Sequence, residues 1–403
     1  MRQSNDSQGK ARKAWLIVVE GIASNLLFGS LFVWSILRNP FLALFPDWND
    51  GMLSTIFGIH NLFICSGILL GGQLCRRLPS RRVYLLFAIL AFVGMAGFAF
   101  LPVDRPGLAF AMAFILFCVF TATGVGIGIN VVQSTTIPWF PQHSGAISGA
   151  LYMALGVSSV LLAALAQKLL PLIGVRYVMP VFGGIILIVA LLVLCDRSSI
   201  LPPSASSETA EAAEGLRTRQ MLRSPAFWVL ILWNICLRTA GLTLLDHAAS
   251  MAAAFGGTAL VAMLIAPANG LGCICVGTAM DKIGMKWIMA IGAAVMIAGG
   301  VLLCIGTLGG GTALIFAGLL LGGFAYGGSS SSYAASIKNR FGSRYYTQNF
   351  AVSNLAMGCA ALLESTSGSV LDASGSYFIV MLIVLVLAVL AFVISLFTGK
   401  AKL

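Results

Sequence analysis

One arginine lies deep inside a long apolar run of this chain. Arg238 stands about 13 residues into the run 225–254. An ionised side chain is costly in the hydrocarbon core of a membrane, so such a residue usually faces a cavity or a partner of opposite charge. Arginine stays charged, and its planar guanidinium can hold a carboxylate through two hydrogen bonds. Arg238 is therefore the first candidate for binding an organic anion. The structural alternative is a buried ion pair with Glu364 or Asp246.

Two neighbours on the same helical face would shape the surroundings of Arg238. Asn234 lies one turn before it, and Gly241 lies nearly one turn after it. The missing side chain at Gly241 would let a backbone or a ligand come close. We therefore expect Asn234 to share a substrate-binding surface with Arg238.

Two acidic residues are candidates for proton coupling or for ion pairing near the other end of these helices. Glu364, in the run 346–371, could carry a proton or could remain ionised as the partner of Arg238. Asp246 lies eight residues after Arg238, which is about 12 Å along a helix and too far for a direct bond. His247 beside it is expected at the membrane interface.

Two further ionisable residues fall in the first two apolar runs. Glu20 can reach Ser24 one turn further on, and a pair with a loop arginine is the alternative. His60 is either a packing residue or a proton relay. Both are candidates for proton coupling.

The composition excludes a soluble protein. Of the 403 residues, 59% are hydrophobic and 9% are charged, whereas soluble domains have about 25% charged residues. A spanning helix needs about 20 apolar residues, so the chain has room for about twelve. The runs lie at 14–37, 51–75, 83–101, 108–137, 145–170, 177–196, 225–254, 258–280, 287–307, 311–337, 346–371 and 376–398.

Motifs of enzymes and metal sites are missing from the sequence. It contains no Walker loop, no HExxH and no GxSxG, and it has three histidines. The nine cysteines show no metal spacing and lie in or at the ends of apolar runs, where they serve as small packing residues. We expect no catalytic residue, no metal and no cofactor.

The twelve runs divide into two sets of six. The polar segment 197–224, rich in Pro, Ser, Ala and Glu, predicts a flexible cytoplasmic linker between a bundle at 1–196 and a bundle at 225–403. Similar loops, GGQLCRRLPSRR and GTAMDKIGMK, follow the second run of each half. Parallel repeats of this kind are typical of duplicated transporter halves.

The positive charges predict the orientation in the membrane. With the N-terminus inside, the inner loops and the two termini hold 19 of the 24 lysines and arginines. Cytoplasmic loops collect such residues, so both termini are expected in the cytoplasm. The net charge of +11 then reflects topology and needs no nucleic acid partner.

The second of the repeated loops resembles the cytoplasmic motif of the major facilitator superfamily. Gly277, Asp281, Lys282 and Gly284 match its spacing. The resemblance implies an all-α fold of twelve transmembrane helices in two six-helix, pseudo-symmetric bundles, with this motif as a cytoplasmic gate. In the first loop Arg76 replaces the aspartate and Pro79 replaces the glycine, which puts the equivalent latch of the first half in doubt.

Within the superfamily the chain is similar to the oxalate/formate antiporter group and to monocarboxylate transporters. The resemblance rests on residues of helices one, four, five and eleven, namely Val33, Trp34, Ser35, the stretch 124–128, Trp139, Phe140, Pro141, Gly145, Gly149, Phe341, Gly342 and Asn349. Helices one, four, seven and ten line the cavity in the superfamily. The resemblance therefore implies that Trp34, Asn130, Tyr326 and Tyr333 join Arg238 at the substrate.

The expected activity is secondary active transport of a small, monocarboxylate-like organic anion by alternating access, coupled to protons or working by anion exchange. The group's carboxylate-binding arginine in helix eight and lysine in helix eleven are missing, because 258–280 and 346–371 contain neither residue type. Oxalate is therefore not the expected substrate. The alternatives are a sensor on a transporter scaffold, or transport of a zwitterionic, neutral or drug-like compound. We expect a monomer in the plasma or inner membrane.

Overall fold

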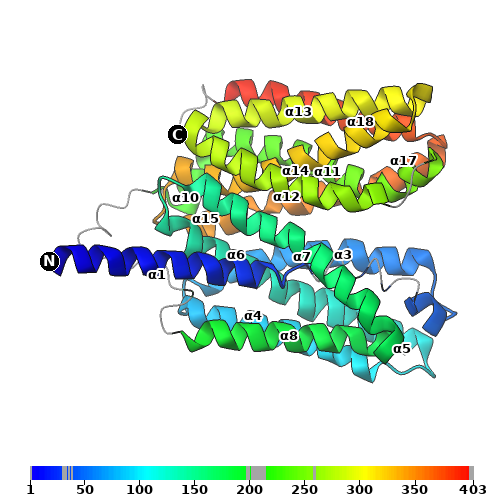
Figure 1. Ribbon diagram of the computed structural model, residues 1–403, viewed down its shortest axis with the longest axis horizontal. Helices are drawn as coiled ribbons and strands as arrows, with labels where there is room; N and C mark the ends of the chain where they lie inside the picture. The colour runs from blue at the N-terminus through cyan, green and yellow to red at the C-terminus, as the bar shows by residue number, and fades with distance from the viewer. Residues whose placement is uncertain are drawn as a thin grey trace. The chain divides into compact units, whose positions relative to one another are not determined.

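The computed structural model describes residues 2–29, 34, 37, 40–196, 200, 215–256 and 260–398. Its helices group into two compact units, which are described separately below. Unit 1 comprises 1–140, 157–206 and 350–354, and unit 2 comprises 141–156, 207–349 and 355–403. Within each unit the long helices run side by side along a common direction (Figure 1). Both units are helical, and the one β-bridge in the described residues joins Gly215 to Gly342.

Unit 1 contains the helices of the first half of the chain. They are α1 (Arg2–Asn25), α3 (Asp50–Leu74), α4 (Ser80–Ala96), α5 (Pro106–Phe114), α6 (Thr123–Thr136) and α8 (Val175–Cys195). A π-helical stretch, Ile115–Ala122, joins α5 to α6, so the fourth expected run is one continuous helix. The second part of α7 (Ser144–Ile173) also belongs to this unit.

Unit 2 contains the first part of α7 and the helices of the second half. They are α10 (Thr218–Arg223), α11 (Pro225–Ala254), α12 (Leu260–Ile283), α13 (Met285–Ile305), α14 (Thr312–Phe341), α15 (Tyr346–Ser353), α16 (Leu355–Glu364), α17 (Thr366–Ser374) and α18 (Tyr377–Phe397). The last residues of α15 fall in unit 1. Each expected run of the second half therefore corresponds to helical structure.

Membrane-spanning character follows from length and apolar composition. Eight helices among the described residues are long and apolar enough to cross a membrane, and α1 and α3 contain shorter apolar stretches. Large apolar side chains such as Leu192, Trp287 and Leu396 are exposed on their outer faces. A lipid environment accepts such side chains, because no water has to be displaced from them.

The turn after α12 depends on a glycine. Gly284 has a φ of +82° and lets α13 begin directly after α12, and side chains rarely tolerate this backbone conformation. Its counterpart in the first half is Pro79, whose φ is −57°. Proline cannot adopt a positive φ, and the connection between α3 and α4 runs through the longer segment 75–79.

Two segments differ in detail from the expected elements. The run 346–371 is not one helix, since it breaks near Asn354 and Ser365 into α15, α16 and α17. The end of the expected flexible linker is ordered against the loop after α14. There the Asn349 side chain donates to the Leu216 carbonyl and accepts from the Thr218 hydroxyl, both at 2.9 Å.

A tyrosine in this loop contacts the same end of the linker. A hydrogen bond from Arg217 lowers the pKa of the Tyr345 phenol. Because cations stabilise the ionised form of a phenol, the nearby Arg344 acts in the same direction. The residues 215–218 are therefore held by backbone, amide and arginine contacts.

Candidate functional site

Arg238 is buried in unit 2. Its side chain is 5% exposed, and its Nε has no hydrogen-bond partner among the described residues. Tyr152, which comes from the first part of α7, lies within electrostatic range of the guanidinium. Tyr152 was not among the residues predicted from the sequence.

Neither acidic candidate pairs with this arginine. Within the part of the chain that the structure describes, no carboxylate oxygen lies within 4.0 Å of the Arg238 guanidinium. Glu364 instead interacts electrostatically with Asp246. Arg238 is thus a buried cation without an ion pair in the described residues, and it retains donor capacity for an anion.

The predicted neighbours of Arg238 come together around it. The buried Asn234 lies one turn away on α11, and its Oδ1 has no partner in the described residues. A Cβ on Gly241 would lie 2.6 Å from Cγ of Tyr326, so the missing side chain lets the α14 phenol pack against α11. Tyr326 also lies within electrostatic range of Arg238.

Helix α12 supplies a fourth wall of this site. The Cys273 thiol donates to the Gly327 carbonyl at 3.3 Å and to Asn269 Oδ1 at 3.5 Å. Cys273 lies within electrostatic range of Arg238. Side chains from α7, α11, α12 and α14 therefore converge on the guanidinium. Tyr333, also predicted at the substrate, is buried two turns further along α14.

A second polar group lies towards the end of α11. The His247 Nε2 is 2.9 Å from the hydroxyl of Ser367 and 3.8 Å from a carboxylate oxygen of Asp246. His247 is buried, whereas the Asp246 side chain is 56% exposed. Glu364 and Asp246 are two carboxylates within electrostatic range of each other.

The candidates of the first half lie in unit 1 and are described there alone. Trp34 stacks on Phe117 at 4.7 Å and donates to the Leu53 carbonyl. His60 also packs on Phe117, and its Nδ1 lies 3.1 Å from the Phe117 carbonyl oxygen. Both rings belong to a buried aromatic cluster of unit 1.

The remaining candidates of unit 1 occupy polar surroundings. Asn130 is fully buried on α6. Glu20 accepts a hydrogen bond from the Ile200 backbone and interacts electrostatically with Arg81 and Asp196. Ser24 donates to the backbone carbonyl of Glu20 and pairs with another hydroxyl group, so it does not contact the carboxylate.

The predicted gating motif holds the beginning of α7. The two carboxylate oxygens of Asp281 accept hydrogen bonds from the backbone N–H groups of Gly145 and Ala146, each at 2.8 Å. These N–H groups have no partner within their own helix, and the helix dipole favours a negative charge there. Asp281 therefore caps α7 with its charge.

Glycines let α7 and α12 lie against each other below this cap. A Cβ on Gly145 would collide with the carbonyl oxygen of Gly277, and a Cβ on Gly277 would collide with that of Gly145. One turn further along α7, a Cβ on Gly149 would meet the Cys273 carbonyl. We call this contact of Gly145 and Gly149 with Gly277 and Cys273 the glycine seam.

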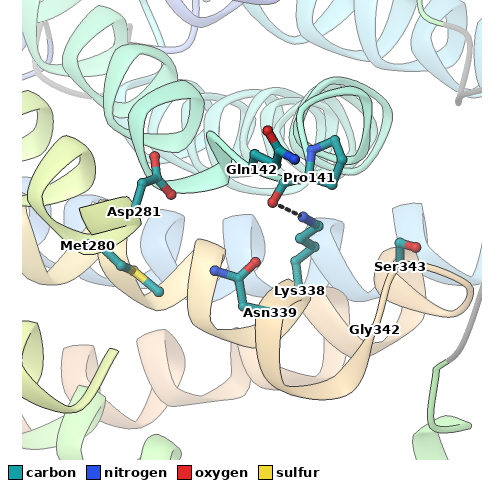
Figure 2. Close-up of a pocket in the computed structure, with 8 residues that line it drawn as sticks. All are labelled: Pro141, Gln142, Met280, Asp281, Lys338, Asn339, Gly342 and Ser343. Atoms are coloured by element: carbon teal, nitrogen blue, oxygen red, sulfur yellow. Dashed lines mark hydrogen bonds between the residues drawn. The ribbon is translucent and has the colours of Figure 1, made fainter. Parts of the chain in front are cut away.

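Helix α14 completes the anchor of α7 around a polar cavity. The cavity of about 620 Å³ is lined by Pro141, Gln142, Met280, Asp281, Lys338, Asn339, Gly342 and Ser343. Figure 2 shows Lys338 reaching towards α7, where its Nζ donates to the Pro141 carbonyl at 2.9 Å. Ser144 donates to Asn339 Oδ1 at 2.9 Å, and Ser148 donates to the Ser331 carbonyl at 2.8 Å.

The corresponding loop of unit 1 has different contacts. Arg76, at the position of Asp281, is exposed. Arg81, at the position of Lys286, donates to the carbonyls of Asp196 at 2.7 Å and of Leu194. This arginine therefore caps the end of α8, because the last carbonyls of a helix have no partner within it.

Sequence reasoning missed the residues that anchor α7. In the sequence, Lys338 is one of the 19 basic residues assigned to the inner side, and Asn339, Ser144 and Ser148 belong to no distinctive pattern. One signal was available for Tyr152, since it is the single tyrosine of the run 145–170 and follows Gly149 by one helical turn.

Comparisons with known proteins agree on one family. The sequence profile described as Major Facilitator Superfamily matches residues 22–363. An uncharacterized MFS-type transporter of Escherichia coli K12, YhjX, is 23% identical over 87% of this chain and 86% of its own length. The oxalate:formate antiporter of Oxalobacter formigenes is 21% identical over 98% of this chain and 94% of its own length.

A solved structure has the same fold. The proton:xylose symporter XylE matches with a TM-score of 0.76 and 16% identity, over 97% of this chain and 96% of that one. At this level of sequence identity, the match shows the fold alone and does not identify the substrate.

Proposed function

Because this chain belongs to the Major Facilitator Superfamily, and is therefore a multi-pass membrane transporter that works by alternating access, we propose that it carries a small organic anion whose carboxylate binds Arg238. The anion enters a site between α7, α11, α12 and α14. Substrate and protein thereby neutralise each other inside the membrane, where an unpaired charge is costly.

The observation that carries this proposal is the state of the guanidinium. Arg238 is buried, forms no ion pair with a described acidic residue and keeps Nε without a partner. A carboxylate bound to two of its donors would satisfy this geometry. A permanent structural pair with Glu364 or Asp246 would have used the same donors, and it is not formed. The amide of Asn234 and the phenol of Tyr326 supply neutral polar groups beside the anion.

The site favours a monocarboxylate over a dianion. The related antiporter of Oxalobacter formigenes is described as exchanging oxalate and formate. In the present chain, the stretches 258–280 and 346–371 hold no lysine or arginine. A second carboxylate would therefore lack a second cation from these helices and would lose the charge-assisted bonds that repay its desolvation.

Uptake into proteoliposomes tests the proposal. Purified protein is reconstituted, and uptake of labelled formate, acetate and oxalate is measured for the wild type, Arg238→Lys and Arg238→Ala. We expect uptake of a monocarboxylate to fall at least about a hundredfold in Arg238→Ala, since removing one partner of a buried charge pair costs about 3–5 kcal/mol. Arg238→Lys retains the positive charge but loses the planar guanidinium that holds a carboxylate through two bonds, so its uptake should lie between that of the wild type and Arg238→Ala.

Removal of an arginine elsewhere serves as the control. Arg76→Gln removes an exposed arginine in the other half and should leave uptake unchanged. Equal anion uptake by the wild type and Arg238→Ala would contradict the proposal. Binding of an anion without any flux would identify a sensor, and uptake restricted to neutral or zwitterionic compounds would assign a different substrate class.

Orientation, coupling and assembly are parts of the same proposal. The clustering of basic residues supports a protein of the plasma or inner membrane whose two termini lie in the cytoplasm. The gate at Asp281 then lies on the cytoplasmic side as well. The acidic pair of Glu364 and Asp246 supports proton coupling, and anion exchange is the other mode. The residues around Arg238 all come from one chain, which supports a monomer as the transporting unit.

A further inference from the structure

We propose that the exposed side of the turn between α12 and α13 binds an anionic phospholipid. The acyl chain lies in a hollow lined by Ile283, Trp287 and Ile291, and the phosphate lies beside Lys282 and Lys286. We call these five residues the lipid groove. The proposal requires a chain that spans a bilayer, as members of the Major Facilitator Superfamily do, and it does not depend on the transported substrate.

The apolar part of the lipid groove is a stripe of exposed side chains. Ile283 is the last residue of α12, while Trp287 and Ile291 lie one turn apart on one face of α13. The three residues line a hollow of about 450 Å³, and their exposed fractions are 46%, 63% and 44%. Tryptophan is enriched where the hydrocarbon of a membrane meets the headgroups. The hollow therefore suits the part of an acyl chain that lies next to its headgroup.

Two lysines are direct sequence neighbours of residues that line the hollow. The Nζ atom of Lys286 lies 5.8 Å from the centroid of the Trp287 ring. Lys282, in the last turn of α12, is exposed as well. Among the described residues, neither ammonium group lies within 4.0 Å of a carboxylate. The nearby Asp281 uses both of its oxygens on backbone N–H groups of α7. The protein thus leaves two positive charges beside an apolar hollow.

The corresponding loop of the first half lacks this arrangement. Arg82 stands at the position of Trp287, so no aromatic ring is present there. Arg81 stands at the position of Lys286 and donates to the carbonyl of Asp196 at 2.7 Å. Its charge is therefore used at the end of α8. The lipid groove is a property of the second half and does not follow from the repeated loop as such.

The chemistry of the groove favours one occupant. A phospholipid joins an apolar chain to a phosphate, which matches a hollow beside two ammonium groups. A zwitterionic headgroup would bring its own cation next to the two lysines, whereas an anionic headgroup brings none. Lysines at the cytoplasmic surface attract the anionic lipids of that leaflet. A second protein surface would instead have to remove water from both ammonium groups, which is costly without a paired anion.

Quenching of tryptophan fluorescence by brominated lipids tests the proposal. Bromine on an acyl chain quenches an indole that it touches. Purified protein is reconstituted into phosphatidylcholine bilayers that contain a rising fraction of either brominated phosphatidylglycerol or brominated phosphatidylcholine. The chain has seven tryptophans, so the Trp287 signal is the difference between the wild type and Trp287→Phe. We expect half-quenching at about a tenfold lower fraction of the anionic lipid, because both lysines attract it.

Removal of the two charges locates the site. Lys282→Gln/Lys286→Gln should abolish the preference for the anionic lipid and leave quenching by brominated phosphatidylcholine unchanged. Arg105→Gln/Lys168→Gln is the matched control, because it removes two exposed basic residues from other parts of the chain, and it should retain the preference. About 1 M salt should weaken the preference in the wild type, since it shortens the Debye length to about 3 Å.

Each of three results would overturn the proposal. Equal half-quenching fractions for the two lipids in the wild type would show that the groove does not select an anionic headgroup. A preference that persists in Lys282→Gln/Lys286→Gln would place the anionic lipid elsewhere. Failure of both lipids to quench Trp287 would mean that a protein surface, such as a second copy of this chain, covers the groove.

Discussion

The carboxylate of Asp281 accepts hydrogen bonds from the backbone N–H groups of Gly145 and its neighbour, and this contact joins the last turn of α12 to the first turn of α7. The two residues are 136 positions apart in the chain. Asp281 belongs to a motif that repeats in the first half with an arginine in its place. Only the second copy of the motif can therefore offer a negative charge to a helix N-terminus.

Removing this charge should loosen α7. Asp281→Asn keeps the size of the side chain but weakens both bonds and the attraction to the helix dipole. We expect a loss of about 1–2 kcal/mol, which corresponds to about a 5- to 30-fold higher rate of Cys273 alkylation without anion. Labelling of Cys273 by N-ethylmaleimide is quantified by mass spectrometry, with the exposed Cys275 as the reference. Arg76→Gln, at the equivalent exposed position, is the control, and continued protection of Cys273 in Asp281→Asn would rule out a latch.

A methyl group in the glycine seam should be harmful, whereas one elsewhere should be harmless. In Gly277→Ala the new Cβ collides with the Gly145 carbonyl, so the helices must separate. We expect a lower unfolding temperature and faster Cys273 labelling. Gly292→Ala in α13 is the matched control, because a Cβ there meets no atom within 4 Å. Alanine favours a helix over glycine by about 1 kcal/mol, so that variant should be slightly more stable. Equal behaviour of the two variants would contradict close packing at the seam.

Gly241 should control the position of the Tyr326 ring. A Cβ in Gly241→Ala would lie 2.6–2.8 Å from atoms of that side chain, so the ring must move away from Arg238. We expect the apparent KM for a transported monocarboxylate to rise about tenfold, which is about 1.4 kcal/mol of lost binding. The double variant Gly241→Ala/Tyr326→Ala should lose no more than Tyr326→Ala alone. An additive loss in uptake assays would mean that the two residues act independently.

Glu364 should carry the coupling proton if transport is proton driven. Glu364→Gln mimics a permanently protonated carboxyl group, so it removes the exchangeable proton. We expect uptake by this variant to lose its response to an imposed pH gradient while exchange of internal for external anion continues. Asp104→Asn is the control, because that aspartate is exposed in unit 1 and takes no part in the proposed site. A preserved gradient response in Glu364→Gln would assign the proton elsewhere.

Some residues of the site can be recognised in the sequence from their type and spacing, whereas others can be recognised only in the structure. Arg238 is conspicuous because a charge in an apolar run has to be explained, and Asn234 and Gly241 follow from helical spacing. Tyr152 has no such signal, since a single tyrosine in an apolar helix is compatible with packing, lipid contact or function. Its role depends on which helix lies opposite.

The sequence by itself determined the membrane class, the positions of the helical runs and the superfamily motif at Asp281. Length and hydrophobicity are sufficient for this, because every spanning segment must satisfy its own backbone within a helix. Only the tertiary structure decided which faces meet: Gly145 on Gly277 and Gly149 on Cys273. Lipid is as apolar as the helix interior, so hydrophobic patterning indicates that a helix spans the membrane but gives little information about its neighbours.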